Sequence, residues 1–270
     1  MKNIAVHYRK VVTPKIYLLN KFLLQAQKEF DTFKNTPEIY AGKVKAISDS
    51  FSLQNPMHLH DTELPDYWAG NLLQRNEKVA LVEINPIYNP ETIAFEKRFS
   101  SRNWDSYSDF HHNLFLYYKN KSAWPLAYYQ SLASGLANKS FKNRTHLDFL
   151  HETVVRFDIL PYTSMDFYKT KLSENAEDYL FNRFTNELLP FMVSNSSIKK
   201  AVLNNKILTR ILLKRNFINE DHMIYVRMNK GRNLDFVYKK NYKGLEIFIF
   251  SRSIRYGGFM KSEVYSNVFG

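Results

Sequence analysis

The sequence contains no cysteine, and this absence excludes several kinds of site together. A disulfide framework, a thiolate nucleophile, an iron–sulfur cluster and a cysteine-ligated zinc site all require that side chain. The sequence also has no Walker-type phosphate loop, no Gly-x-Gly-x-x-Gly element and no Gly-x-Ser-x-Gly elbow. These absences disfavour P-loop nucleotide hydrolysis, dinucleotide oxidoreduction and the usual serine esterase arrangement.

Long apolar segments are missing as well. No stretch approaches the roughly eighteen uncharged apolar residues that a membrane span needs. Residues 1–10 lack the apolar run and the small-residue cleavage site of a signal peptide. We therefore expect a soluble, cytoplasmic protein.

The composition is that of a globular chain, with 44% hydrophobic and 16% aromatic residues over 270 positions. Such a chain can bury one large core or two modest ones. We see no internal repeat, low-complexity tract or linker. The sequence therefore predicts a single domain, 1–270, in which 1–60 form an N-terminal helical extension and 61–270 form an α/β core.

The net charge of +12 is distributed unevenly along the chain. Residues 196–270 hold fifteen Lys and Arg against five Asp and Glu, whereas residues 61–195 hold fourteen against seventeen. A basic region of this kind attracts a polyanion through phosphate contacts. The charge indicates either a nucleic-acid partner, with DNA the first choice, or simply a protein from a lysine-rich proteome.

Helices and short buried strands alternate along the sequence. Apolar periodicity predicts a first helix over 15–33 and an irregular segment over 46–76. Residues 79–84 are a mostly apolar run closed by Asn85-Pro86, as is typical of a parallel strand buried on both faces. Similar patterns predict helices at 107–119, 124–137, 143–152, 173–193 and 206–215, strands at 154–160, 200–203 and 246–250, and a hairpin of strands 223–228 and 234–238.

This alternation predicts the fold class. Crossovers longer than about ten residues favour parallel pairing with helices on both faces of the sheet. We therefore expect a three-layer α/β/α fold with a mostly parallel central sheet of about four strands. An N-terminal helix and a β-hairpin in the C-terminal half would complete it.

Three strand ends carry unusual residues, and ligands of open parallel sheets bind beyond the carboxyl ends of the strands. These segments are Ile84-Asn85-Pro86-Ile87-Tyr88-Asn89-Pro90, with the lead-in Tyr67-Trp68-Ala69-Gly70-Asn71, then Asp158-Ile159-Leu160-Pro161-Tyr162-Thr163-Ser164, and Ser251-Arg252-Ser253-Ile254-Arg255-Tyr256-Gly257-Gly258-Phe259. In order and approximate spacing they resemble the strand-end motifs of the uracil-DNA glycosylase superfamily. The resemblance covers 67–270 and leaves the N-terminal helix unexplained.

The resemblance implies hydrolysis of an N-glycosidic bond in nucleic acid, with the target base extruded from the stack and no metal or cofactor required. Asn85 stands where the family has the Asp or Asn that positions or activates the water. An amide can orient water but cannot accept its proton, so Asn85 implies slow chemistry or a supporting base. Glu83 is either that base or a surface or capping residue.

The other two segments depart from the family pattern. Asp158 stands where a uracil-specific member has an asparagine, and an ionised carboxylate only accepts hydrogen bonds, so it would favour a base that presents amino or imino hydrogens. Ser251 takes the place of the family's histidine, which stabilises charge on the departing base. Tyr88 and Tyr162 would wall the base pocket or simply pack, and Phe95 or Phe99 would be the stacking aromatic. The expected nucleic-acid contacts are Arg252, Ser253, Arg255, Tyr256 and Lys261.

Several alternatives stay open at this point. The pairs His58/His60 and His111/His112 have metal-like spacing, but they lack a third convergent carboxylate, so we expect no metal. The leading hypothesis is a base-excision enzyme that uses Asn85 and Ser251. The alternatives are a nucleic-acid-binding protein that kept the fold and lost catalysis, and a nucleotide or small-molecule hydrolase on the same scaffold.

Overall fold

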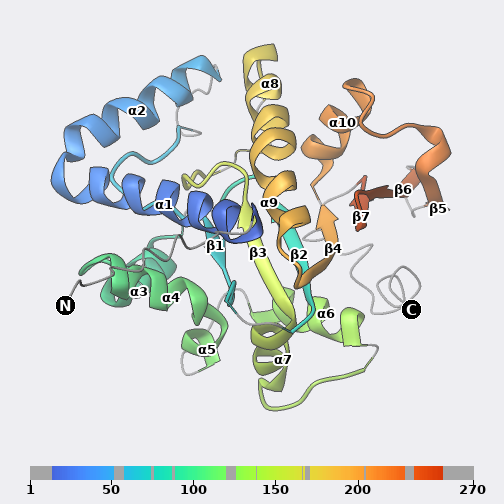
Figure 1. Ribbon diagram of the computed structural model, residues 1–270, viewed down its shortest axis with the longest axis horizontal. Coiled ribbons are helices and arrows are strands. Elements are labelled where there is room, and N and C mark those ends of the chain that lie inside the picture. The colour runs from blue at the N-terminus through green and yellow to red at the C-terminus, as the bar shows by residue number, and fades with distance from the viewer. Residues whose placement is uncertain are drawn as a thin grey trace, which may run out of the picture.

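The computed structural model describes residues 14–51, 58–73, 76–86, 89–119, 126–137, 139–165, 167, 171–203, 205–228 and 234–251. Within these residues, seven strands form one sheet in the order β1-β3-β2-β4-β7-β6-β5 (Figure 1). The sheet is mixed. The chain is thus an α/β protein, as the sequence predicts.

Four central strands run parallel, and antiparallel strands flank them on both sides. The parallel strands are β3 (Val154–Asp158), β2 (Lys78–Glu83), β4 (Ile198–Leu203) and β7 (Leu245–Phe250). The short β1 (Trp68–Ala69) is antiparallel to β3, and β6 (Leu234–Tyr242) joins β7 to the edge strand β5 (Met223–Met228). The sheet is therefore wider than the four strands expected, because β1 joins one side of the parallel strands and the predicted hairpin joins the other through β6.

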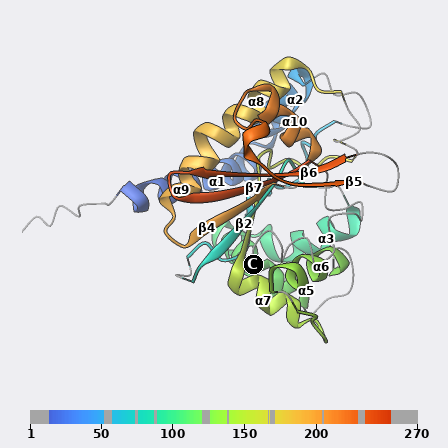
Figure 2. The ribbon, with the colours of Figure 1, turned by 90° about the vertical axis from the view of Figure 1, so that its right-hand side faces the viewer.

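Helices cover both faces of the sheet (Figure 2). One face carries α1 (Pro14–Asn35), α2 (Pro37–Ser50), α8 (Glu174–Asn182), α9 (Leu189–Ser194) and α10 (Lys206–Lys214). The other carries α3 (Pro90–Ser100), α5 (Leu114–Lys119), α6 (Leu126–Ala137) and α7 (Thr145–Thr153). Helix α4 (Trp104–His112) packs beside β1, with Tyr107 in the cluster that includes residues of α1 and Phe110 in the cluster that includes residues of α5. A 3-10 turn, Glu220–His222, precedes β5.

Each face of the sheet has its own hydrophobic cluster. On β2, Ala80 and Val82 belong to the cluster that includes residues of α1 and α8, while Leu81 belongs to the cluster that includes residues of α5 and α7. Side chains alternate between the two faces of a strand, so a strand buried on both faces needs apolar residues at nearly every position. This explains why the strands read as continuous apolar runs in the sequence.

The long helix predicted over 173–193 is interrupted. A π-helical turn spans Arg183–Leu188 between α8 and α9, and the Leu189 N–H bonds to the carbonyl of Phe184, five residues back. Pro190 follows at once and has no N–H with which to continue the α-helical ladder. We attribute the wide turn to this proline, because π turns absorb such local defects inside helices.

The N-terminal helices share the core with the rest of the chain. Phe22 of α1 stacks on Phe191 of α9 with ring centroids 4.6 Å apart. Phe30 of α1 and Tyr40 and Val44 of α2 are buried in the same cluster as β2 and β3. Residues 14–51 therefore form part of the packed molecule. No helix in the described part of the chain is both long and apolar enough to cross a membrane.

Candidate functional site at the carboxyl edge of the sheet

The carboxyl ends of β2 and β3 meet, as the sequence motifs predict. The loop after β3 bonds to the loop after β2 through Ile159 N–H to Glu83 O at 3.0 Å and Leu160 N–H to Ile84 O at 2.7 Å. The chain passes from β2 to β3 through α3–α7, most of which lie on one face, and from β3 to β4 through α8–α9 on the other. The strand order therefore reverses beside β2, and such a switch point is where open α/β sheets bind ligands.

Asn85 lies at this edge with its amide held in one orientation. The Nδ2 group donates to Ser164 Oγ at 2.7 Å and to the carbonyl oxygens of Tyr162 and Pro86, each at 3.2 Å. Carbonyl oxygens only accept, so the network assigns nitrogen rather than oxygen to this side of the amide. The described residues provide no hydrogen-bond partner for Oδ1, which is thus an acceptor available to water or substrate.

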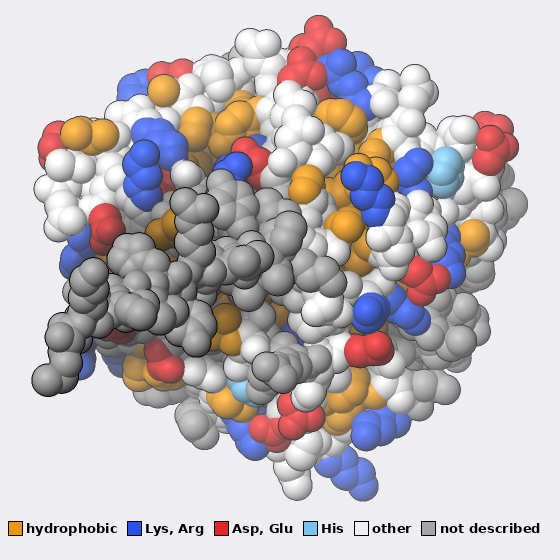
Figure 3. Space-filling view, viewed as in Figure 1, with side chains coloured by type: hydrophobic (Ala, Val, Ile, Leu, Met, Phe, Trp, Pro, Cys, Tyr) orange, Lys and Arg blue, Asp and Glu red, His pale blue; other side chains and the backbone are white. Residues whose placement is uncertain are grey.

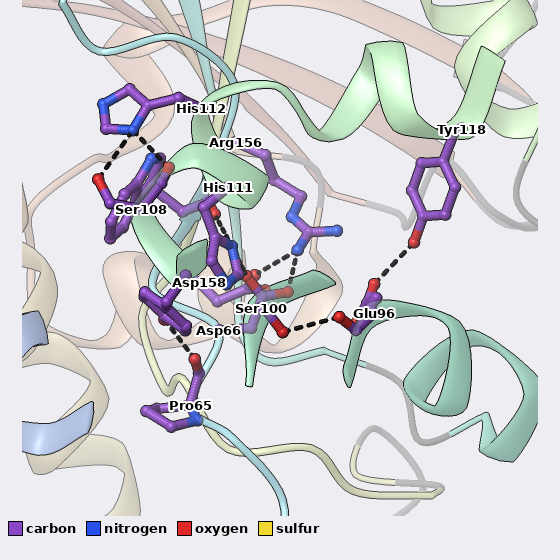
Figure 4. A network of polar contacts seen from close by, with 12 residues as sticks. Pro65, Asp66, Glu96, Ser100, Ser108, His111, His112, Tyr118, Arg156 and Asp158 are labelled. Atoms are coloured by element: carbon purple, nitrogen blue, oxygen red, sulfur yellow. Dashed lines mark hydrogen bonds and ion pairs between the residues drawn. The ribbon is translucent and has the colours of Figure 1, made fainter. Parts of the chain in front are cut away.

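Asp158 ends β3 and is fully enclosed. Its side chain has 0% exposure, and its Oδ2 lies 3.2 Å from Nη2 of Arg156, two residues earlier on the same strand. The same Nη2 also pairs with Asp66. In this structure the carboxylate that the sequence assigns to base recognition is held by an arginine (Figure 4).

A buried polar network surrounds Arg156. His111 of α4 has its Nδ1 2.7 Å from the carbonyl of Trp68 and 3.4 Å from Asp66 Oδ1. The carbonyl can only accept, so Nδ1 carries the proton. Burial alone would raise the pKa of Asp66, but the positive charge of Arg156 and the proximity of His111 outweigh this effect, and the pKa lies below its usual value. Sequence reasoning missed this network because its members come from separate elements.

Glu96 of α3 is a carboxyl of this region whose pKa is raised. Tyr118 Oη donates to Glu96 Oε1 at 2.7 Å. Burial, with a further contribution from the negative charge of Asp66, raises the pKa of Glu96 to about 7. A carboxyl with such a pKa can hold or release a proton near neutral pH.

Glu83 is buried, with 7% exposure, so a surface role is excluded. In the sheet it lies opposite Asp158, and it lies two residues from Leu81, which is opposite Arg156. Side chains at this spacing lie on the same face. Glu83 therefore faces the side of the sheet that carries the Arg156 network, and its charge acts on Arg156.

Tyr162 and Ser251 are both engaged in contacts within the chain. Tyr162 is 2% exposed, and its Oη donates to Glu29 Oε1 of α1 at 2.6 Å. The Ser251 Oγ accepts from Phe236 N–H at 2.7 Å, and its N–H donates to Phe236 O at 3.0 Å, so Ser251 continues the β6–β7 pairing. Ser251 follows β7, two strands from β2, which places it about 10 Å away along the same edge.

The remaining predicted site residues divide into two groups. Phe95 stacks on Tyr118 and Phe99 on Phe110, with ring centroids 5.8 Å and 6.2 Å apart, so both phenylalanines pack in the helical layer. The others lie outside the described residues: Tyr88, Arg252, Ser253, Arg255, Tyr256 and Lys261.

The basic last quarter of the chain is partly neutralised by α8. Glu177 of α8 accepts from Arg210 at 3.0 Å and from Lys214 at 2.7 Å, and Arg215 pairs with Asp178. Figure 3 shows basic and acidic side chains interspersed on the visible face near α8 and α10, without a uniform basic patch. Charge alone therefore overstates the surface available to a polyanion.

The described residues contain no group of three or more His, Asp or Glu side chains placed to hold a metal ion. No protein-family model, no curated protein and no solved structure matches the chain.

Proposed function

We propose that the protein hydrolyses the N-glycosidic bond of a damaged or modified base in nucleic acid, on a three-layer α/β/α scaffold of the uracil-DNA glycosylase type. The observation that supports this best is the fixed amide of Asn85 at the switch point of the sheet. Its Nδ2 is committed to three acceptors, so Oδ1 can hold a water molecule in one place. Placing the nucleophile in this way lowers the entropic part of the barrier.

In the proposed reaction, the water oxygen forms a bond to the anomeric carbon of the sugar. The bond from that carbon to the base nitrogen breaks, and the base leaves with the electron pair and takes up a proton. The water must lose a proton, which the Asn85 amide cannot accept. Glu83, two residues before Asn85 and buried on the side of the Arg156 network, is the proposed supporting base.

Asp158 is the proposed base-reading group. As an ionised acceptor it would select a base with amino or imino hydrogens. Because Arg156 now holds it at 3.2 Å, recognition requires the guanidinium to turn away or to be shared with the base. This requirement predicts weak discrimination among bases that offer similar donors.

One observation favours the second candidate, a nucleic-acid-binding protein without catalysis. The Ser251 hydroxyl accepts a bond from the β6 backbone, and Asp158 is paired with Arg156. Both side chains that the motifs place beside Asn85 are thus already engaged in contacts within the chain. Such a protein would bind nucleic acid with strong salt dependence and release no base.

The test is a screen of single- and double-stranded oligonucleotides that carry uracil, hypoxanthine, xanthine or alkylated bases, followed by alkaline cleavage at abasic sites. We expect cleavage of at least one substrate, reduced about 10²-fold in Asn85→Ala because the water loses its position. Asn182→Ala, which removes an exposed amide on α8, is the matched control and should retain wild-type activity. If wild-type protein gives no more abasic product than Asn85→Ala on any substrate, the enzyme proposal fails for that panel. Salt-dependent binding would then support the second candidate.

A further inference from the structure

Glu29 of α1 is a buried carboxylate that links the N-terminal helix to the strand ends. It is 3% exposed, and three groups contact it: the hydroxyls of Tyr162 and Tyr67 and the ammonium of Lys43. A carboxylate only accepts, so both tyrosines must donate to it. Burial and the charge of Glu29 raise the pKa of both tyrosines above the usual value, so these hydroxyls stay protonated.

Tyr162 connects Glu29 to Asn85. Its side chain is held by Glu29 at 2.6 Å, while its backbone carbonyl accepts from Asn85 Nδ2 at 3.2 Å. Holding the ring of Tyr162 therefore helps to hold one of the three oxygens that accept from the Asn85 amide. Among the described residues that contact Glu29, which are Lys43, Tyr67 and Tyr162, only Tyr162 also forms a hydrogen bond with Asn85.

Other contacts hold the same loop at its ends. Arg183, in the π-helical turn, donates from Nε to Ile159 O at 3.3 Å. The Ser164 N–H donates to Pro86 O at 3.2 Å. Backbone bonds also hold the residues on either side of Tyr162, because the Asp66 N–H donates to Pro161 O at 2.7 Å and the His60 N–H donates to Thr163 O at 2.9 Å. The side chain of Tyr162 itself is held by its bond to Glu29.

We propose that Glu29 is a positioning residue, which acts through Tyr162 to keep the Asn85 amide turned so that Oδ1 faces away from the three acceptors of Nδ2. Helix α1 is then a required part of the site. The effect on reaction rate rests on the proposed function, whereas the effect on the Asn85 amide does not. This role accounts for a part of the chain that the strand-end motifs leave unexplained.

The decisive variants are Glu29→Gln and Tyr162→Phe. Glutamine keeps the size of the side chain but replaces one acceptor oxygen with an amide nitrogen, so it can no longer accept from both tyrosines. Tyr162→Phe removes only the hydroxyl and leaves the backbone carbonyl in place. Helix α1 should stay docked in both variants, because Ala26 and Phe30 remain buried in the core.

The first measurement is the NMR signal of the Asn85 side-chain amide, assigned by its loss in Asn85→Ala. We expect this signal to shift and its hydrogens to exchange faster with solvent in both variants. Asp31→Asn, which removes an exposed carboxylate from the same helix, is the control and should leave the signal unchanged. A merely structural role of Glu29 would lower thermal stability without moving this signal in the folded protein.

The second measurement is turnover on a substrate found by the oligonucleotide screen. We expect kcat to fall roughly tenfold or more with KM little changed, since misplacement by about 1 Å can cost about 10²-fold in rate. If Glu29→Gln does not fold, Tyr162→Phe decides the question. An unchanged Asn85 signal in folded Tyr162→Phe overturns the positioning role, whether or not the protein has glycosylase activity. A changed signal without any activity on the panel upholds the positioning role and leaves the proposed function without support.

Discussion

Replacing Asn85 by aspartate changes a single group, from an amide nitrogen to a carboxylate oxygen. That oxygen would face the carbonyls of Tyr162 and Pro86, to which Nδ2 now donates. We expect Asn85→Asp to lower the free energy of unfolding by about 1–3 kcal/mol at neutral pH, because two acceptors lose their donor and meet a negative charge. Urea unfolding at pH 7 measures the loss.

The matched control is Asn89→Asp. Asn89 caps α3 by accepting from the N–H groups of Glu91 and Thr92, and aspartate caps a helix equally well. The free energy of unfolding of Asn89→Asp should therefore stay within about a few tenths of a kcal/mol of the wild-type value. Equal stability of Asn85→Asp and wild type would show that the amide orientation derived from the hydrogen bonds is incorrect.

The raised pKa of Glu96 predicts that the stability of the protein depends on pH. Burial raises its pKa from the ordinary 4.5 to about 7, so the folded state binds this proton more tightly than the unfolded state. The contribution of Glu96 to the free energy of unfolding is therefore greatest below about pH 4.5. It declines as the pH rises towards about 7, by at most about 3 kcal/mol. Glu96→Gln should remove this decline, because the amide is neutral at all these pH values and still offers an acceptor to Tyr118.

Urea unfolding of wild type and Glu96→Gln at pH 5 and pH 8 tests this expectation. From pH 5 to pH 8, the free energy of unfolding of Glu96→Gln should rise relative to that of wild type by roughly 1–3 kcal/mol. Glu91→Gln, an exposed glutamate at the start of the same helix, should follow the wild-type pH profile. Parallel profiles for wild type and Glu96→Gln would mean that Glu96 ionises normally.

At the residue scale, the sequence allowed some site residues to be located and hid others. Asn85 and Asp158 could be located because each directly follows or ends an apolar run that folds as a parallel strand. Glu29 and Asp66 could not, since a buried carboxylate is recognised only by its partners. Those partners, Tyr162 and Arg156, lie far away in the sequence.

At the scale of elements, strands and long helices were predictable because burial imposes a regular pattern on them. The predicted strands at 79–84, 154–160, 200–203 and 246–250 correspond to β2, β3, β4 and β7 within a few residues. Helix α2 and helix α3 were not predicted. In α2 only Tyr40, Val44 and Ser48 are almost completely buried, and in α3 only Ser100, while the other residues are at least partly exposed, so neither helix has a strong apolar stripe. Strand β1, with two residues, is too short for any periodic pattern.

Helix α10 depends on a cap at the carboxyl edge of the sheet. Asn205 accepts from the N–H groups of Ile207 and Leu208, at 2.9 Å and 3.4 Å, just after β4 ends. We expect Asn205→Ala to lower stability by about 1 kcal/mol, and Asn205→Asp to leave it nearly unchanged. Thermal unfolding of both variants separates a lost cap from a general intolerance at this position. Equal losses in the two variants would contradict the capping role.

At the scale of the whole molecule, α1 and α2 close one face of the sheet. A chain that begins at residue 61 would expose side chains that now pack against Phe30, Tyr40, Val44 and Phe51. Burial of each large apolar side chain contributes about 1.5–3 kcal/mol, and the whole stability of a domain is only about 5–15 kcal/mol. We expect the 61–270 chain to lack a cooperative thermal transition and to recover one when residues 14–60 are co-expressed as a separate peptide. A cooperative transition in the shortened chain alone would show that the first sixty residues are a dispensable extension.

The balance of charge between α8 and α10 should control affinity for nucleic acid. Glu177 of α8 holds Arg210 and Lys214, and its bond with Lys214 lowers the pKa of Glu177 below the usual value, so it is ionised at neutral pH. Glu177→Gln removes this charge and releases both cations. If a polyanion lies across α10, its affinity should rise a few-fold, and the slope of log K against log salt should steepen by up to about one.

Glu38→Gln is the control that separates a local effect from net charge. It removes one exposed carboxylate from α2, so both variants carry the same net charge. Fluorescence anisotropy with a labelled oligonucleotide over a range of salt concentrations gives both affinities and both slopes. A larger gain for Glu177→Gln than for Glu38→Gln places the polyanion near α10. Equal gains would mean that the basic last quarter attracts nucleic acid only through the overall charge, and the contact surface would then have to lie elsewhere on the molecule.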